Sequence, residues 1–217
     1  MCGRRSRYYV RGVSQAVKFP AAVPPPAERR ADPTAERRAD PTAVHPGGVS
    51  NDEFRAAMSR LAAGVVLVTA QEEQLGEGGP AGEDVGMTAT AFMSVSLDPP
   101  LVLVSIREGS RMDDLLAEQP RWAVSVLAES QRHIAGRFAM KGRISDRLLF
   151  EDIPYVRGEF SGAPLVGGAL ATLECETESR VAAGDHTLVV GRVMAASLPS
   201  AEGGPLMYFR GRYRQLG

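Results

Sequence analysis

The sequence GMTATAFMSVSLDPPLVLVSI, at residues 86–106, is the stretch that decides the fold. It begins with small and hydroxyl-bearing residues, closes on Asp-Pro-Pro and runs into an apolar, strand-like segment. Residues 86–100 contain no Lys, Arg, His or Cys, so they do not form an acid–base or metal site. They offer backbone amides and flat apolar surface, with the hydroxyls of Thr88, Thr90, Ser94 and Ser96. These groups suit a planar ligand that is polar at its edges and carries no metal.

The length of 217 residues predicts one domain, or one domain with a tail. The net charge of −1 is unevenly spread. Residues 1–48 hold nine of the 25 Lys and Arg but four of the 26 Asp and Glu, which leaves 16 basic and 22 acidic residues in the rest. Phosphate backbones are bound by clustered cations, so an acidic body excludes nucleic acid as the main partner.

The two cysteines, Cys2 and Cys175, are far apart and form neither a disulfide framework nor a metal-ligand spacing. A reducing cytoplasm fits this pattern best, and we expect a cytoplasmic protein. No run is long and apolar enough to span a bilayer, and no signal-peptide core precedes PAAVPPP. We therefore expect no membrane partner.

The chain divides into a tail at residues 1–48 and a folded domain at residues 49–217. The tail is rich in Pro, Ala and Arg, and it contains AERRADPT twice, at residues 27–34 and 35–42. It has few large apolar side chains with which to bury a core, so we expect it to be disordered.

The domain begins with a predicted helix. Ser50 and Glu53 form a capping box, and Phe54, Met58 and Leu61 follow at helical spacing. This spacing predicts a short amphipathic helix that packs one face inward.

Most of the remaining chain is predicted to be β-structure. Two further helices are predicted, with N-caps at Ser110 and Ser130, and Asp113 completes a capping box with Ser110. Residues 72–84 are predicted to form an acidic, Gly-rich hairpin loop. Strands are expected at residues 64–70, 86–96, 101–107, 121–128, 169–177, 186–196 and 206–213. Many strands without βαβ alternation predict an antiparallel barrel, and the glycines at 76–82 lack the spacing of a dinucleotide-binding fingerprint.

The 86–100 segment strongly resembles the flavin-binding motif of the short-chain flavin reductases. Four further blocks resemble the same family in the expected order. They are REGSRMDDLL at 107–116, WAVSVLAESQRHIAGRFA at 122–139, AGDHTLVVGRV at 183–193 and PLMYFRGRYRQL at 205–216. The resemblance runs from about residue 54 to residue 216.

The resemblance implies a mainly β fold, the FMN-binding split β-barrel of these reductases. It also implies a homodimer with the flavin near the subunit interface. The activity it implies is NAD(P)H:flavin oxidoreductase: hydride passes from NADH or NADPH to FMN or FAD. The reduced flavin then supplies a separate flavin-dependent monooxygenase.

Carried over by position, the resemblance places the flavin along residues 86–96. It places Ser110 and Arg111 at the phosphate, where helix amides and a guanidinium converge. Residues 137–139 and Lys141 close over the cofactor end. The implied cofactor-binding residues are Met87, Thr88, Ala89, Thr90, Ser94, Val95, Ser96, Ser110, Arg111, Arg137, Phe138 and Lys141.

His186 has two interpretations. It is a strand histidine bonded to Asp185, or, by resemblance, a catalytic residue on the nicotinamide side of the flavin. No metal role is expected, because His45 lies in the tail, His133 lies on a predicted helix and there is no cysteine pair. The residues expected to serve packing are Cys175, Met87, Met93 and Trp122.

Two other functions stay open at this stage. One is a flavin-binding or electron-carrier protein of the same barrel without nicotinamide reductase activity, which the Gly184-Asp185-His186 block disfavours. The other is an interaction module that uses the barrel without a cofactor. No basic cluster surrounds Asp185, which favours NADH over NADPH.

Overall fold

The computed structural model describes residues 48–73, 82–140, 146–199 and 203–216. The predicted tail, most of the 72–84 loop and Lys141 therefore lie outside the described residues. The described helices are α1 (Asn51–Met58), α2 (Arg111–Glu118), the short 3-10 helix η1 (Glu129–Gln131), α3 (Arg132–Phe138) and α4 (Asp146–Phe150). The described strands are β1 (Ala63–Gly64), β2 (Val66–Gln71), β3 (Asp84–Ala89), β4 (Phe92–Leu97), β5 (Pro100–Arg107), β6 (Arg121–Val126), β7 (Tyr155–Arg157), β8 (Pro164–Val166), β9 (Ala171–Ala183), β10 (His186–Ser197), β11 (Met207–Phe209) and β12 (Arg212–Arg214).

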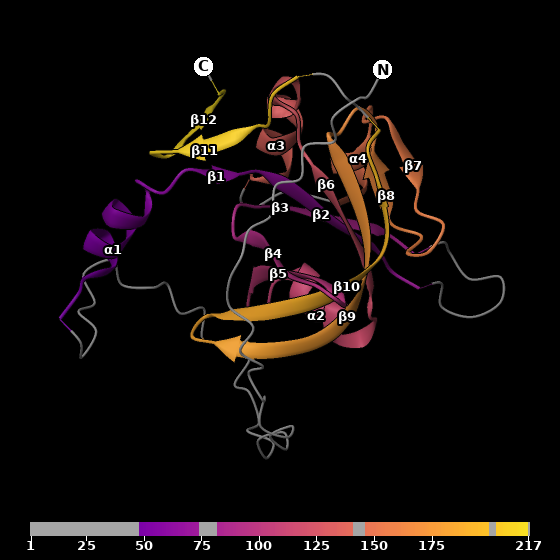
Figure 1. Cartoon of the computed structure of the whole chain (residues 1–217), viewed down its shortest axis with the longest axis horizontal. Coiled ribbons are helices and arrows are strands. Elements are labelled where there is room, and N and C mark those ends of the chain that lie inside the picture. Colours follow the sequence, from indigo (N-terminus) through magenta and orange to yellow (C-terminus); the bar gives the residue numbers. More distant parts are fainter. Residues whose placement is uncertain (1–47, 74–81, 141–145, 200–202, 217) are drawn as a thin grey trace, which may run out of the picture. The chain divides into compact units, whose positions relative to one another are not determined.

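A seven-stranded antiparallel sheet forms the body of the domain, in the order β3-β2-β6-β9-β10-β5-β4 (Figure 1). Its two edge strands, β3 and β4, follow each other in the chain and are joined by residues 90–91. β3 also contacts β5, from the opposite end of the strand order, so the sheet curls back on itself. We call the place where the edges of β3 and β4 face each other the seam. The mainly β fold with a few short helices is confirmed.

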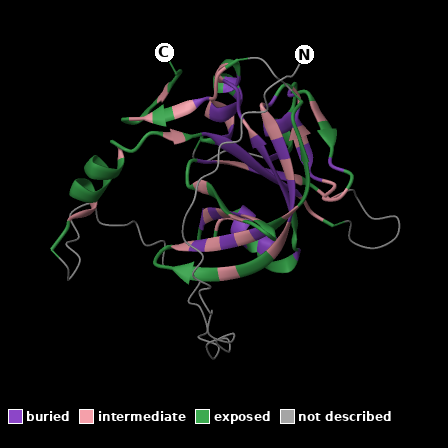
Figure 2. Cartoon of the chain, in the orientation of Figure 1, coloured by how far each residue is buried: buried purple, intermediate pink, exposed green. Residues whose placement is uncertain are grey.

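Two apolar clusters lie on the two faces of β2. Val66 and Val68 belong to the cluster inside the curled sheet, together with side chains of α2. Val65 and Leu67 belong to the second cluster, under α3 and α4. β2 is coloured as buried along most of its length in Figure 2, and burial on both faces explains why residues 64–70 form a continuous apolar run.

Gly191 admits the single tryptophan into the inner cluster. A Cβ placed on Gly191 would lie 2.4 Å from Cζ2 of Trp122, whose side chain is fully buried. Cys175, opposite Trp122 in the β6–β9 ladder, is also fully buried. Burial, followed by the charge of Glu174, raises the pKa of its thiol to about 12, which confirms Cys175 as an inert core residue.

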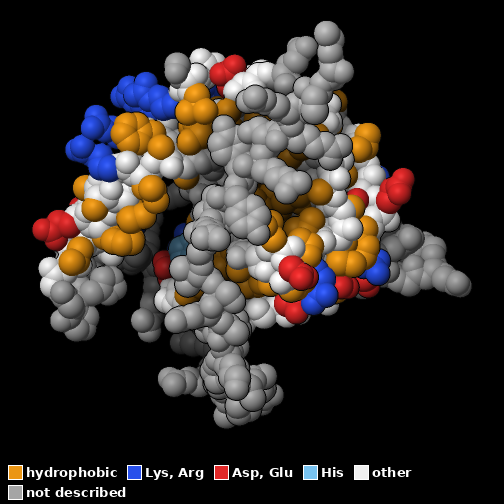
Figure 3. Space-filling view, viewed as in Figure 1, with side chains coloured by type: hydrophobic (Ala, Val, Ile, Leu, Met, Phe, Trp, Pro, Cys, Tyr) orange, Lys and Arg blue, Asp and Glu red, His pale blue; other side chains and the backbone are white. Residues whose placement is uncertain are grey.

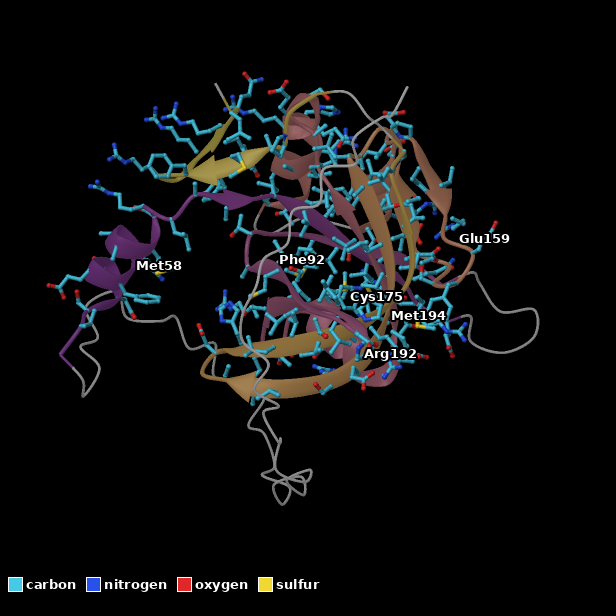
Figure 4. The ribbon with its side chains drawn as sticks, viewed as in Figure 1. Met58, Phe92, Glu159, Cys175, Arg192 and Met194 are labelled. Carbon is cyan, nitrogen blue, oxygen red and sulfur yellow. The ribbon has the colours of Figure 1, made fainter. Side chains whose placement is uncertain are left out.

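The first helix begins as predicted but packs differently. Ser50 accepts a hydrogen bond from the Glu53 amide, and the Glu53 carboxylate accepts one from the Ser50 amide. However, α1 contains no buried residue, and Phe54 and Leu61 are 60% and 63% exposed. The predicted inward packing of this helix is therefore wrong; Figure 3 shows apolar side chains on its surface, and Figure 4 shows Met58 there.

Several other sequence predictions are also corrected. The single strand expected at 86–96 is two strands, because residues 90–91 turn the chain from one sheet edge to the other. Residues 206–213 contribute to a hairpin, β11–β12, whose turn holds Arg210 and Gly211 at positive φ. α4 and the β7–β8 hairpin were not predicted.

Helix capping accounts for one further error. Ser130 does not cap α3; the Gln131 side chain instead accepts from the Ala128 amide at the start of η1.

No helix among the described residues is long and apolar enough to cross a membrane.

Candidate functional site

β4 is an exposed edge strand and forms one side of the seam. Within the described part of the chain its only strand partner is β5, so the opposite edge leaves backbone groups without a strand partner. Thr90, Ser94 and Val95 are exposed, and Ser96 is half-buried. A register shift between Ser94 and Ser96 makes a bulge, a feature that redirects side chains next to binding sites.

Phe92 adds apolar surface to this strand. It is half-buried, packs against the inner cluster and pairs with Val104 of β5 (Figure 4). Met93, on the opposite face of the strand, is 59% exposed and does not pack in the core of the single chain. The edge strand thus combines unpaired amides, hydroxyls and an aromatic ring.

The predicted residues of β3 point to different sides of the sheet. Met87 packs against the inner cluster, and Ala89 is a buried member of it. Thr88 alternates with them and is half-buried on the other face. Only the end of β3, where Thr90 is exposed, opens onto the seam.

The predicted α3 residues serve packing in this structure. Phe138 is buried beside Phe150, with ring centroids 4.9 Å apart. A Cβ on Gly86 would lie 2.6 Å from Phe138 Cε1, so glycine is required where these rings cross β3. Arg137 donates to the carbonyls of Leu149 and Glu151 at the end of α4.

The N-terminus of α2 lies at the end of β5. Ser110 caps the helix by accepting from the Asp113 amide at 3.3 Å. The Asp113 carboxylate accepts from the amide of Gly109, one residue before the amide that a capping box would use. Asp113 also binds Arg180 of β9, so the start of α2 is held against the sheet.

His186 begins β10 beside this helix start. It pairs with Arg107 of β5, and the Glu108 amide donates to the Asp185 carbonyl at 3.1 Å. The Ser105 amide donates to the Ala91 carbonyl at 3.0 Å, so the seam lies at the same end of β5. The structure therefore places Thr90, Ser110 and His186 at the same end of β5.

The imidazole of His186 is held in a defined orientation. Its Nδ1 lies 2.8 Å from Asp185 Oδ1, while its side chain remains 42% exposed. The hydrogen bond to His186 lowers the pKa of Asp185. A carboxylate on Nδ1 leaves Nε2 for an external partner.

Arg111 is surrounded by carboxylates. Its Nη2 donates to Glu72 at 2.8 Å and to Glu83 at 2.7 Å, and its Nη1 donates to Asp146 at 2.8 Å. Burial lowers the pKa of Arg111, but the bonds to Glu72 and Glu83 outweigh it and the net direction is upward. Sequence reasoning missed these partners, although the acidic composition of residues 72–84 was a signal.

A separate cavity of about 670 Å³ lies at the other end of α2. It is lined by Gln119, Arg121, Phe160 and four glutamates, among them Glu159 between β7 and β8 (Figure 4) and Glu72, which also binds Arg111. None of the predicted flavin-binding residues lines it. We place the candidate site at the seam, because hydroxyls, free backbone and an oriented histidine converge there.

The seam defines a class of site. It supplies hydrogen-bond donors, apolar surface and one exposed imidazole, as a site that binds and orients a planar ligand requires. No group of three or more potential metal ligands occurs among the residues that the structure describes.

Comparisons with known proteins give the family. The model of the flavin reductase like domain matches residues 58–217. An NADH-dependent flavin reductase of a Rhodococcus species is 42% identical over 164 residues, which cover 75% of this chain and 84% of the relative. The reductase component of a 4-hydroxyphenylacetate 3-monooxygenase of Thermus thermophilus is 38% identical, covering 76% and 96%.

Solved structures agree with this result. The NADH:FAD oxidoreductase SgcE6 of Streptomyces globisporus, in complex with NAD and FAD fragments, superposes with a TM-score of 0.67 at 34% identity. The match covers 76% of this chain and 92% of that one. The chain belongs to the flavin reductase like family, as the sequence motifs predicted.

Proposed function

We propose that this chain is an NADH:flavin oxidoreductase that reduces FMN or FAD. The observation that carries the proposal is the family match over residues 58–217, in a fold whose seam presents the flavin-binding motif on an exposed edge. Both curated relatives and the SgcE6 structure named above are NADH-dependent reductases or reductase components by name.

The groups at the seam fit a flavin. Its ring is flat and apolar with polar edges, and β4 offers Phe92, the hydroxyls of Ser94 and Ser96, and an unpaired backbone edge. Thr90 and the start of α2 with Ser110 complete the proposed site. Four of the predicted residues would act indirectly, because they pack inside the strands and helices that frame the seam: Met87, Ala89, Arg137 and Phe138.

When bound, the flavin supplies a hydride acceptor at N5 for the hydride on C4 of NADH. The chain needs no nucleophile for this chemistry. The residues of β4 would hold the ring and shield it from water. His186, held by Asp185, would position the nicotinamide through Nε2, so we propose it as the residue that touches the co-substrate.

We also propose that the chain is a homodimer. The outer face of β4, β5, β9 and β10, which we call the outer β face, is apolar in the middle. Its apolar side chains come from all four strands: Met93, Leu103, Val181, Leu188 and Val190. Arg107 and His186 lie at its rim, so a partner subunit there would cover apolar surface next to the seam.

The reduced flavin would supply a separate monooxygenase, as the name of the Thermus relative describes for that protein. We propose a cytoplasmic location, where NADH is available; the buried free thiol of Cys175 fits a reducing compartment.

The experiment is a steady-state assay with NADH or NADPH against FMN or FAD. NADH-dependent reduction of free flavin supports the proposal. A protein that binds FMN but oxidises no NADH would instead be a flavin carrier, and one that stays colourless after soaking in FMN would be an interaction module.

A further inference from the structure

Arg111 is the cation that the family resemblance places at the flavin phosphate, yet its guanidinium already has three anionic partners. Two of them, Glu72 and Glu83, share Nη2 at 2.8 and 2.7 Å. The third, Asp146, is almost fully buried and binds Nη1 at 2.8 Å. One positive charge therefore faces three negative charges.

The three carboxylates differ in exposure, which divides their roles. The Asp146 side chain is 4% exposed, so its pairing with Arg111 anchors α4 to α2 and contributes to the fold. The side chains of Glu72 and Glu83 are 36% and 48% exposed. Both bind Nη2, the guanidinium nitrogen that Asp146 leaves to them, and they are the solvent-accessible members of the cluster.

Glu72 and Glu83 are also held in place by each other. The Glu72 amide donates to the Glu83 carbonyl at 3.0 Å, and the Glu83 amide donates to the Glu72 carboxylate at 3.3 Å. These contacts lie just beyond Gln71 and Asp84, the last residue pair of the β2–β3 ladder. The two glutamates are thus tied to each other next to Arg111, and the Glu72 carboxylate bridges the Glu83 amide and the guanidinium.

We propose that Glu72 and Glu83 determine flavin specificity by withholding Arg111 from the flavin phosphate. A phosphate that approaches Arg111 must displace two carboxylates or bind beside them, so the guanidinium adds little affinity. The chain then binds riboflavin about as tightly as FMN and relies on the ring for recognition. This inference rests on the proposed function, because it concerns the flavin bound at the same seam.

The test is equilibrium binding of FMN and of riboflavin, followed by flavin fluorescence without NADH. The native chain is expected to bind both flavins within about three-fold of each other. The Glu72→Gln/Glu83→Gln variant keeps side-chain shape and removes two charges. It should bind FMN roughly three- to ten-fold more tightly, with riboflavin unchanged.

Adding Arg111→Ala to that variant should abolish the gain, because the guanidinium is the group released. The matched control is Asp52→Asn, which removes the charge of an exposed carboxylate paired with Arg55 on α1 and should change neither affinity. Melting curves check that all variants fold.

Two results would overturn the inference while leaving the proposed function intact. They are a native chain that prefers FMN by ten-fold or more, and a double variant whose FMN and riboflavin affinities change equally. A native chain that binds neither flavin would overturn the inference and the proposed function together.

Discussion

Gly86 shows how one residue of the flavin motif serves the fold instead of the ligand. Its missing Cβ makes room for Phe138 and Phe150, which would lie 2.6 and 2.9 Å from that atom. Both distances are shorter than ordinary van der Waals contact, so an alanine here would force the two rings to move within a buried, close-packed cluster.

We predict that Gly86→Ala lowers the free energy of unfolding by about 1–3 kcal/mol, the usual result of overpacking a core. Urea unfolding measures it. Gly136→Ala is the matched control: nothing lies within 4 Å of its Cβ on α3, so this change should be neutral or slightly stabilising. Equal stability of Gly86→Ala and the native chain would show that the two rings do not pack as described.

His186 is the residue on which the proposed chemistry depends most directly. We predict that His186→Ala slows NADH-dependent flavin reduction while flavin affinity stays within a few-fold of native. Loss of Nε2 removes a group that positions the nicotinamide, and β4 still holds the flavin. Stopped-flow reduction and flavin titration measure the two effects separately.

A scaffold role for His186 gives a different pattern. The imidazole would then matter only for its bond to Asp185, and the variant would melt lower with an unchanged reduction rate. An unchanged reduction rate in the folded variant would remove His186 from the site.

Helix caps were predicted correctly from the sequence where the hydrogen-bond partner of the capping side chain lies only three residues away. Ser50 and Ser110 were identified as caps because each bonds an amide three residues away. Ser130 was wrong because Gln131, one residue later, bonds the Ala128 amide and also donates to Gly167, a contact 36 residues away. The carboxylates around Arg111 could not be located from sequence for the same reason.

Among the elements, β4 and α1 show where sequence patterns fail. Residues 86–96 were predicted as one strand because Thr90 and Ala91, which separate β3 from β4, carry no Gly or Pro turn signal; the curl of the sheet requires the turn there. The helical spacing of apolar residues in α1 predicted that one face of the helix is buried, but the spacing does not specify which part of the protein covers that face. The predicted site residues on β4 lie on an exposed edge strand, whereas Phe138 on α3 is buried in the second cluster, a position that sequence spacing did not indicate.

The outer β face provides the prediction at the scale of elements. Leu188→Glu should convert a homodimer into monomers, because burying an ionised carboxylate in an apolar contact between subunits has a large desolvation cost. Sedimentation at micromolar concentration measures the mass. The control is Leu148→Glu on α4, 52% exposed, which should leave the dimer intact.

A dimer that persists in Leu188→Glu would place the interface elsewhere. A native chain that sediments as a monomer would contradict the homodimer itself.

At the scale of the whole molecule, the family match begins at residue 58 and the repeats lie before it. We predict that deletion of residues 1–48 leaves melting temperature and reductase activity unchanged, because the repeated segment offers few large apolar side chains for a core. Ser50 and its capping box remain in the truncated chain. A fall of several degrees in melting temperature would show that the tail contacts the domain.

The most direct test of the central claim is a single turnover without oxygen. The native chain is mixed with FMN and then with NADH in a stopped-flow instrument, and the visible absorbance of the oxidised flavin is followed. The account predicts rapid bleaching that slows when NADH carries deuterium at C4, since that hydride is transferred. A chain that binds FMN but leaves it oxidised in the presence of NADH would contradict it.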